Sequence, residues 1–185
     1  MSPNATNRAV FLDRDGTILV EGTNYVGKVE HVVLIPQAPQ ALKRLQDAGY
    51  KLFVITNQSG VGRGYFTREA VDSIHAHLDE QFARAGVRFD RYYICPHHPE
   101  DNCDCRKPKP KFLLDAAREF GLDLSRCFMV GDRAGDVQAG ANAGVKSILV
   151  LTGDGRETLA KQEVKPDHVA NDIAEAAAWI LRPGS

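Results

Sequence analysis

Short apolar segments alternate with longer amphipathic ones along most of the chain, and this alternation constrains the fold most strongly. The segments rich in Val, Ile, Leu, Phe or Tyr are predicted strands, at residues 9–12, 51–55, 91–95, 127–130 and 147–151. Helical periodicity or helix-capping residues predict helices at 37–48, 67–85, 111–120, 134–143 and 173–181. Strands that alternate with helices are typical of βα units. The sequence therefore predicts an α/β fold, Rossmann-like, with three layers and a central parallel sheet.

The chain length limits the number of domains. A chain of 185 residues with 43% hydrophobic and 25% charged residues can form one ordinary hydrophobic core. The loops predicted at residues 16–36 and 96–110 are too short to be separate domains. We therefore expect one domain over residues 1–185, with short terminal tails and no large cap domain.

Two carboxylates follow the first predicted strand directly, in Asp13-Arg14-Asp15-Gly16-Thr17. Because alternate side chains of an extended segment point the same way, Asp13 and Asp15 can both face a ligand beyond the strand end. An ionised carboxylate can attack phosphorus where cations neutralise the phosphate, and a second carboxylate can transfer the proton. An isolated Asp-x-Asp-Gly is more often only a turn.

Further polar residues follow the later predicted strands, and their order favours the catalytic interpretation. Thr56 and Asn57 follow the second strand, Lys107 follows the third, and Asp132 and Asp136 follow the fourth. Right-handed crossovers bring such strand ends to one edge of the sheet. A hydroxyl, an ammonium group and several carboxylates at this edge predict phosphoryl transfer with Mg²⁺, which prefers oxygen ligands.

These motifs, in this order, resemble those of the haloacid dehalogenase (HAD) superfamily of aspartate-nucleophile phosphatases. More narrowly, segments 11–17, 56–60, 95–99 and 103–108 resemble the D-glycero-D-manno-heptose-1,7-bisphosphate phosphatases and the related histidinol-phosphate phosphatases. The resemblance spans roughly residues 9–153. It implies hydrolysis of a small phosphorylated metabolite.

The resemblance also implies roles for single residues. Asp13 would be the nucleophile and Asp15 the general acid and base. The magnesium ligands would be Asp13, the backbone carbonyl of Asp15, and Asp132. The transferring phosphoryl group would be bound and oriented by Thr56, Arg106 and Lys107.

Other residues are predicted to contact substrate or to support the site. The predicted substrate contacts are Asn57, Gln58, Ser59, Arg106, Lys107 and Arg133. Asp136 would either bind the metal through water or orient Lys107 or Arg133, and we favour the supporting role. Arg63 would either meet a distal phosphate or belong to a flexible glycine-rich connection, and the sequence leaves both interpretations open.

A cluster of cysteines predicts a second metal site. Cys95, His97, Cys103 and Cys105 offer three thiolates and one imidazole, a complete tetrahedral set for structural Zn²⁺. Coincidental or redox cysteines are the alternative. The resemblance assigns the imidazole to His97 rather than to His98. Zinc in the loop at about 95–107 would hold the cationic residues that follow the last ligand.

The net charge of -1 predicts a small substrate, since it provides no broad cationic field for nucleic acid or an anionic membrane. No segment approaches the roughly 18 apolar residues that a membrane helix requires. We therefore expect a cytoplasmic protein, a monomer, that acts on a small phosphorylated sugar.

The predicted reaction, carried by the resemblance, is removal of the C7 phosphate of a heptose 1,7-bisphosphate, in the synthesis of nucleotide-activated heptose for lipopolysaccharide. The alternatives are a histidinol-phosphate phosphatase, a nucleic-acid 3′-phosphatase and a catalytically silent zinc module. The short metal loop favours the first alternative.

The remaining histidines and the last cysteine are predicted to have no catalytic role. His75 and His77 are expected to be solvated on a charged helix. His31 and His168 have no recognisable partner in the sequence. Cys127 is predicted to be a buried thiol within a strand.

Overall fold

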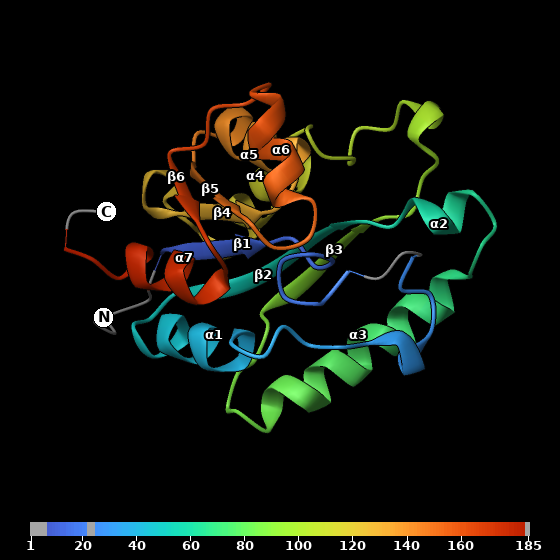
Figure 1. Cartoon of the computed structure of the whole chain (residues 1–185), viewed down its shortest axis with the longest axis horizontal. Helices are drawn as coiled ribbons and strands as arrows, with labels where there is room; N and C mark the ends of the chain where they lie inside the picture. The colour runs from blue at the N-terminus through green and yellow to red at the C-terminus, as the bar shows by residue number, and fades with distance from the viewer. Residues whose placement is uncertain (1–6, 22–24, 184–185) are drawn as a thin grey trace.

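The computed structural model describes residues 7–21 and 25–183, so residues 1–6, 22–24 and 184–185 lie outside it, and with them most of the short tails expected at the two termini. Parallel strands form one six-stranded sheet in the order β3-β2-β1-β4-β5-β6 (Figure 1). The strands are β1 Ala9–Leu12, β2 Lys51–Asn57, β3 Arg91–Cys95, β4 Phe128–Gly131, β5 Lys146–Val150 and β6 His168–Ala170. The predicted parallel sheet is confirmed.

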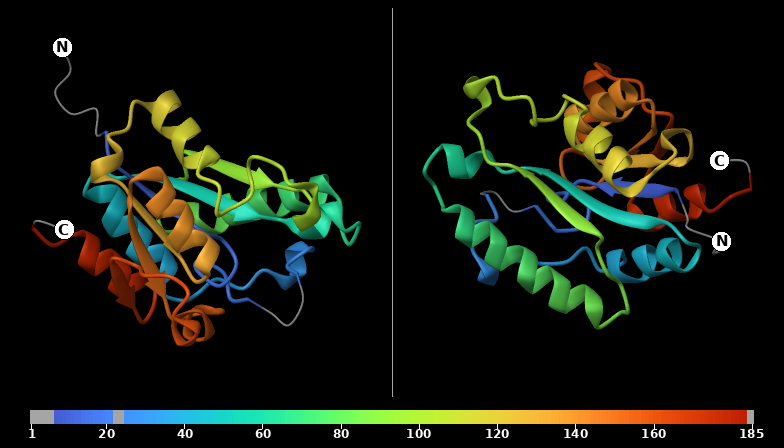
Figure 2. Two further views of the ribbon diagram at one scale, coloured as in Figure 1. Left: turned by 90° about the horizontal axis from the view of Figure 1, so that it is seen from above. Right: turned by 180° about the vertical axis from the view of Figure 1, so that it is seen from behind.

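Helices cover both faces of this sheet, which confirms the predicted three layers. The α-helices are α1 Ala38–Asp47, α2 Ser59–Gly62, α3 Arg68–Ala83, α4 Lys111–Phe120, α5 Ala134–Ala143, α6 Gly155–Lys161 and α7 Ile173–Ile180. Short 3₁₀ turns lie at Val29–His31, Pro99–Asp101 and Leu124–Arg126. One face of the sheet is covered by α1, α3 and α7 and the other by α4 and α5 (Figures 1 and 2).

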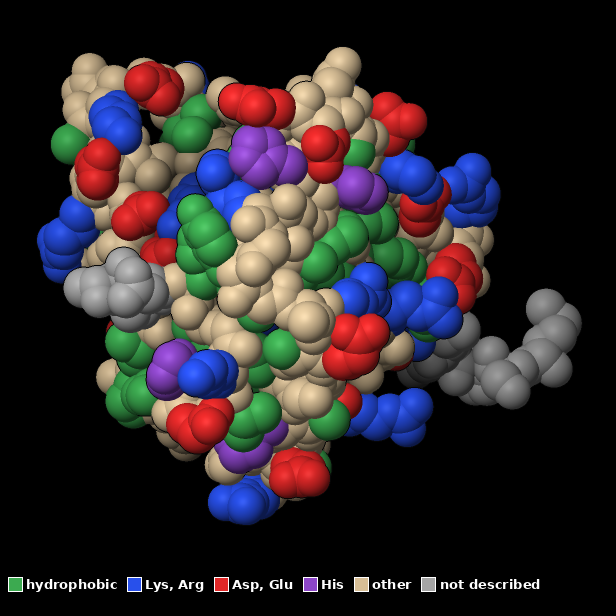
Figure 3. Space-filling view, turned by 90° about the vertical axis from the view of Figure 1, so that its right-hand side faces the viewer, with side chains coloured by type: hydrophobic (Ala, Val, Ile, Leu, Met, Phe, Trp, Pro, Cys, Tyr) green, Lys and Arg blue, Asp and Glu red, His purple; other side chains and the backbone are tan. Residues whose placement is uncertain are grey.

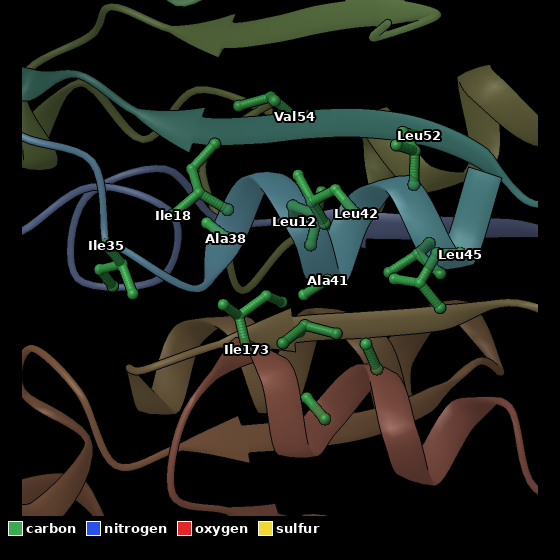
Figure 4. Packing of buried hydrophobic residues seen from close by; sticks show 14 of the residues in the cluster. Leu12, Ile18, Ile35, Ala38, Ala41, Leu42, Leu45, Leu52, Val54 and Ile173 are labelled. Carbon is green, nitrogen blue, oxygen red and sulfur yellow. The ribbon is translucent and has the colours of Figure 1, made fainter. Parts of the chain in front are cut away.

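The central strand β1 is buried on both faces, as expected for a parallel sheet between two helical layers. Val10 and Leu12 pack into the core beneath α1, α3 and α7, whereas Ala9 and Phe11 pack into the core beneath α4. Figure 4 shows the apolar face of α1 turned toward this core, with Ala38, Ala41, Leu42 and Leu45 beside Leu12 and Ile173. Each fully buried Leu contributes about 1.5–3 kcal/mol.

Most predicted elements are confirmed to within one or two residues. α3 begins after Thr67, whose side-chain oxygen accepts a hydrogen bond from the Ala70 amide, as its position predicted. Three short elements, α2, α6 and β6, were not predicted. Cys127 is buried as expected but lies just before β4 rather than within it.

The strand order reverses next to β1, and open α/β sheets bind ligands at such a position. Leu12 is in register with Val54 of β2 and Val130 of β4. Asp13, which follows Leu12, and Asp132, which follows β4, therefore emerge side by side at the carboxyl edge of the sheet. None of the helices in the described part of the chain is long and apolar enough to cross a membrane.

Candidate active site

A cavity of about 480 Å³ opens at the carboxyl edge of the sheet. Most residues that the sequence singled out line it, namely Asp13, Asp15, Thr56, Asn57, Ser59, Arg63, Arg106, Lys107, Arg133 and Asp136. Asp13 and Asp15 face the same cavity although the chain bends at Arg14 and turns back toward Leu19. The fold thus brings together side chains from four separate stretches of sequence.

Lys107 lies at the base of this cavity, almost completely buried. Its Nζ atom is 2.6 Å from Oδ1 of Asp13 and 2.6 Å from Oδ1 of Asp136, and it donates to the carbonyl oxygen of Ile55 at 2.7 Å. Burial alone would lower the pKa of Lys107, but the two carboxylates outweigh it and raise the pKa to about 12. The ammonium group therefore stays charged, and Asp136 supports it as the sequence favoured.

Three buried carboxylates surround one small volume. Oxygen atoms of Asp13, Asp132 and Asp136 lie within 4.8 Å of one another. Burial raises the pKa of Asp13, and burial together with the charges of Asp13 and Asp136 raises the pKa of Asp132 to about 8. Carboxylates that repel one another in this way fit a divalent cation with oxygen ligands, such as Mg²⁺.

One backbone amide and one hydroxyl group hold Asp132 in place. The Asp154 amide donates to its Oδ2 at 2.8 Å, and the Thr17 hydroxyl donates to its Oδ1 at 3.4 Å. Gly16 lies beside Asp132 and has a φ angle of +82°. A Cβ atom at this position would lie 2.3 Å from Asp132 Oδ2. The motif therefore requires glycine at this position for conformation and for space.

Asp15 is held by two donors from behind the cavity. The buried guanidinium of Arg14 pairs with it, with Nη2 at 2.9 Å from Oδ2. Gln58 donates from Nε2 to Asp15 Oδ2 at 2.8 Å and to Thr56 Oγ1 at 2.7 Å. The sequence placed Gln58 among the substrate contacts, whereas the structure buries it and turns its amide toward these two residues.

Asn57 also has partners within the protein. Its side chain donates to the Lys107 carbonyl at 3.2 Å and accepts from the Lys107 amide at 3.1 Å. These two hydrogen bonds join the end of β2 to the segment that carries Arg106 and Lys107. Asn57 therefore fixes the two cations in addition to lining the cavity.

Arg106 lines the cavity with unused hydrogen-bonding capacity. Its Nη1 atom is buried and has no hydrogen-bond partner among the described residues. A buried guanidinium nitrogen without an acceptor is costly. An anionic oxygen of a bound phosphate would satisfy it.

Arg133 stands at the rim of the cavity, where its side chain is 53% exposed. It pairs with Glu21, and its Nε atom lies 3.1 Å from Oδ2 of Asp154. Neither carboxylate was predicted as part of the site. Asp154 could have been found, because it follows β5 as the other site residues follow their strands; Glu21 carries no such signal.

The predicted zinc ligands also converge. Cys95 Sγ lies 3.5 Å from Cys103 Sγ, and His97 Nδ1 lies 3.3 Å from Cys105 Sγ. Around a tetrahedral ion with Zn–S bonds of about 2.3 Å, sulfur atoms are about 3.8 Å apart. His98 is turned elsewhere, since its Nδ1 accepts from the Glu100 amide at 3.2 Å. The donor set and spacing therefore fit zinc bound through His97.

Comparisons with known proteins identify the family. The HAD-hydrolase-like family model matches residues 104–176. The D-glycero-beta-D-manno-heptose-1,7-bisphosphate 7-phosphatase of Pseudomonas aeruginosa is 38% identical over 173 residues, 94% of this chain and 97% of its own. The enzyme of the same name from Helicobacter pylori strain J99 is 45% identical over 148 residues, 80% of this chain and 84% of its own. The chain belongs to the heptose-1,7-bisphosphate 7-phosphatase family of HAD-like hydrolases.

A solved structure from this family matches the whole fold. The D,D-heptose 1,7-bisphosphate phosphatase of B. bronchiseptica, complexed with magnesium and phosphate, superposes with a TM-score of 0.90 at 36% identity. The match covers 94% of this chain and 98% of that one. The family resemblance drawn from the sequence motifs is thereby confirmed.

The expectation that His75 is solvated is wrong for this family member. His75 is buried, and its ring stacks on Tyr92 with centroids 4.2 Å apart. Burial and then the charge of Arg14 lower its pKa to about 3, so the imidazole is neutral. His168 likewise has a partner, the ring of Trp179, at 4.7 Å.

Proposed function

We propose that this chain removes the 7-phosphate of D-glycero-beta-D-manno-heptose 1,7-bisphosphate through an aspartyl-phosphate on Asp13. The proposal rests on the ion pair between Asp13 and Lys107 in a cavity that Arg106 also lines, with a buried nitrogen that has no hydrogen-bond partner among the described residues. The names of the P. aeruginosa and H. pylori relatives support the substrate and its beta anomer.

In the proposed first step, an Asp13 carboxylate oxygen attacks the 7-phosphorus and the bond to the sugar oxygen breaks. Thr56, Arg106 and Lys107 hold the phosphoryl oxygens, because phosphoryl transfer depends on positioning and charge neutralisation. Asp13, Asp132 and the Asp15 carbonyl would hold Mg²⁺, which supplies further neutralisation of the phosphate when bound.

Asp15 carries the proton in both steps. It protonates the departing sugar oxygen, and in the second step it takes a proton from the water that attacks the aspartyl-phosphate. Phosphate leaves, and Asp13 returns as a free carboxylate. Gln58 and Arg14 keep the Asp15 carboxylate in place by donating to it from behind.

We further propose a structural Zn²⁺ on Cys95, His97, Cys103 and Cys105. Arg106 and Lys107 follow the last ligand directly, so the ion would fix the segment that presents both cations to the phosphate. The monomeric state and the cytoplasmic location stay predictions.

The charge distribution supports a small substrate over a nucleic-acid end. A groove that follows a polynucleotide backbone carries a continuous basic stripe. On the face drawn in Figure 3, basic side chains are interspersed with acidic ones.

The proposal is tested by comparing kcat/KM, with Mg²⁺, for both anomers of the heptose bisphosphate, for histidinol phosphate and for a 3′-phosphorylated oligonucleotide. We expect the beta anomer to be preferred over histidinol phosphate and the oligonucleotide by at least about a hundredfold. Equal or faster turnover of histidinol phosphate would overturn the substrate while leaving the reaction class intact.

A further inference from the structure

Arg14, the residue between the two catalytic aspartates, is completely buried and makes contacts in two directions. Its Nε and Nη2 atoms face the Asp15 carboxylate at 2.9–3.2 Å, and Nη2 also donates to the Val26 carbonyl at 3.3 Å. The remaining terminal nitrogen, Nη1, lies 3.3 Å from Nε2 of His75. The guanidinium thus joins His75 to Asp15.

The protonation state of His75 follows from this contact. Arginine has only donors, so the contact requires a lone pair on His75 Nε2 and a proton on Nδ1. A neutral imidazole meets this requirement, in agreement with the burial of the ring beside a cation. His75 is therefore the acceptor for Arg14 Nη1.

The environment of His75 restricts its movement. It lies on the buried face of α3, and its ring is nearly parallel to that of Tyr92 on β3, with an interplanar angle of 15°. The Tyr92 hydroxyl donates to Asp79, one turn further along α3, at 2.8 Å. The His75 ring is thus held in place by α3, by Tyr92 on β3 and by the hydrogen bond between these two elements.

We propose that His75 is a positioning residue for proton transfer, which sets the orientation of Asp15 through Arg14. A guanidinium is planar and rigid, so an acceptor at one end fixes the fork that meets the carboxylate at the other. This inference rests on the proposed function, because it takes Asp15 as the residue that protonates the departing sugar oxygen. His75 contacts Arg14 and Tyr92 and does not line the cavity.

An apolar residue in place of His75 would leave Arg14 Nη1 buried without this acceptor. The guanidinium would then turn toward other acceptors, and the Asp15 carboxylate would turn with it. The defect should affect both proton transfers by Asp15, and kcat/KM isolates the first of them, in which the leaving group needs a proton.

The test compares His75→Leu with His75→Gln, whose amide oxygen is as many bonds from Cα as Nε2 is. His77→Leu is the matched control, since His77 lies on the same helix and contacts Gln81 instead of Arg14. Each protein is assayed on two substrates. The heptose bisphosphate is an alkyl phosphate, whose leaving group needs a proton, whereas the leaving group of p-nitrophenyl phosphate departs without one. Thermal unfolding is recorded for each variant.

His75→Leu should lower kcat/KM for the heptose bisphosphate about tenfold, which is a fraction of the rate enhancement that a general acid provides. It should lower kcat/KM for p-nitrophenyl phosphate less than about twofold. His75→Gln should recover most of the loss, and His77→Leu should match the wild type. An equal loss on both substrates, or no loss on either, would overturn the inference.

The activity of the wild type tests the substrate separately from the role of His75. If the wild type does not hydrolyse the heptose bisphosphate, the substrate proposal fails, and the same comparison is made with histidinol phosphate, whose leaving group also needs a proton. If His75→Leu does not fold, His75→Asn replaces it, because its shorter side chain holds the amide oxygen one bond closer to the helix than Nε2.

Discussion

Lys107 follows Asp13 by 94 residues, yet its Nζ atom lies 2.6 Å from the Asp13 carboxylate in the buried base of the cavity. Asp136 holds the same ammonium group from its other side at 2.6 Å. A buried ion pair contributes little net stability, but removal of one partner leaves the other charge uncompensated. The Lys107 ammonium group therefore lies beside the proposed nucleophile, and the stability of the fold depends on its charge.

Lys107→Met should therefore destabilise the protein as well as abolish activity. Without the ammonium group, Asp13 and Asp136 are buried carboxylates with no cation, and we expect a loss of about 3–5 kcal/mol in the free energy of unfolding. Urea titration in EDTA measures it. Lys43→Met is the control: Lys43 forms an exposed ion pair with Asp47, so its loss should cost less than about 1 kcal/mol. Equal costs for the two variants would contradict the account.

Gly16→Ala should remove activity by displacing Asp132. Gly16 and Gly121 both have positive φ, +82° and +63°, so alanine at either position costs about 1–2 kcal/mol of backbone strain. Only at Gly16 would the new Cβ meet a neighbour, Asp132 Oδ2 at 2.3 Å; at Gly121 it meets nothing within 4 Å. Gly121→Ala should therefore keep its kcat, whereas Gly16→Ala should lose at least about a hundredfold. The account fails if kcat is the same in both variants.

Cys105→Ser should lower the zinc content and weaken substrate binding. The loop between Cys95 and Lys107 includes a Pro99–Asp101 turn and mostly exposed residues, so the ion is expected to fix its conformation. We expect less than one zinc per chain by elemental analysis and an increase in KM of about tenfold, as Arg106 and Lys107 lose their fixed position. Cys127→Ser is the control: it changes a buried thiol outside the cluster, so this variant should keep its zinc. Unchanged zinc content in Cys105→Ser would contradict the assignment.

Stabilisation by Mg²⁺ should increase with pH. Burial and neighbouring carboxylates raise the pKa of Asp132 from 3.8 to about 8 in the metal-free protein. A carboxyl group whose pKa is raised on folding contributes stability that is complete below its unfolded pKa and is lost as pH rises through its folded pKa. Between these two pKa values, ionisation of Asp132 lowers the free energy of unfolding, and a bound cation would restore it. The increase in Tm on adding Mg²⁺ should be larger at about pH 8 than at about pH 6. An increase that is constant or smaller at the higher pH would contradict this sign.

The sheet and most helices were predictable because their signals are local. Periodicity, Thr67 as an N-cap and Gly121 as a left-handed cap mark the helices within one or two residues. α2, at Ser59–Gly62, is short and glycine-rich, and β6 has only three residues, so neither leaves a recognisable period. Their formation depends on contacts with the rest of the fold.

The site was predictable as a group of residues, but their individual partners were not. Strand order brings Asp13, Thr56 and Asp132 together, and that order follows from the βα pattern. The inward turn of Gln58 depends on side-chain contacts that no pattern encodes. His75 is different, because it lies four residues after Val71 and three before Leu78 on the apolar face of α3, so periodicity alone places it in the core.

In the proposed reaction, the 7-phosphoryl group of heptose 1,7-bisphosphate is transferred to the Asp13 carboxylate before it is released as inorganic phosphate. Phosphorus NMR of the substrate, incubated with Mg²⁺ and either the wild type or Asp13→Asn, tests it most directly. The wild type should convert the 7-phosphate signal to inorganic phosphate and retain the 1-phosphate signal, while Asp13→Asn should leave both unchanged. Loss of the 1-phosphate, or turnover by Asp13→Asn, would contradict it.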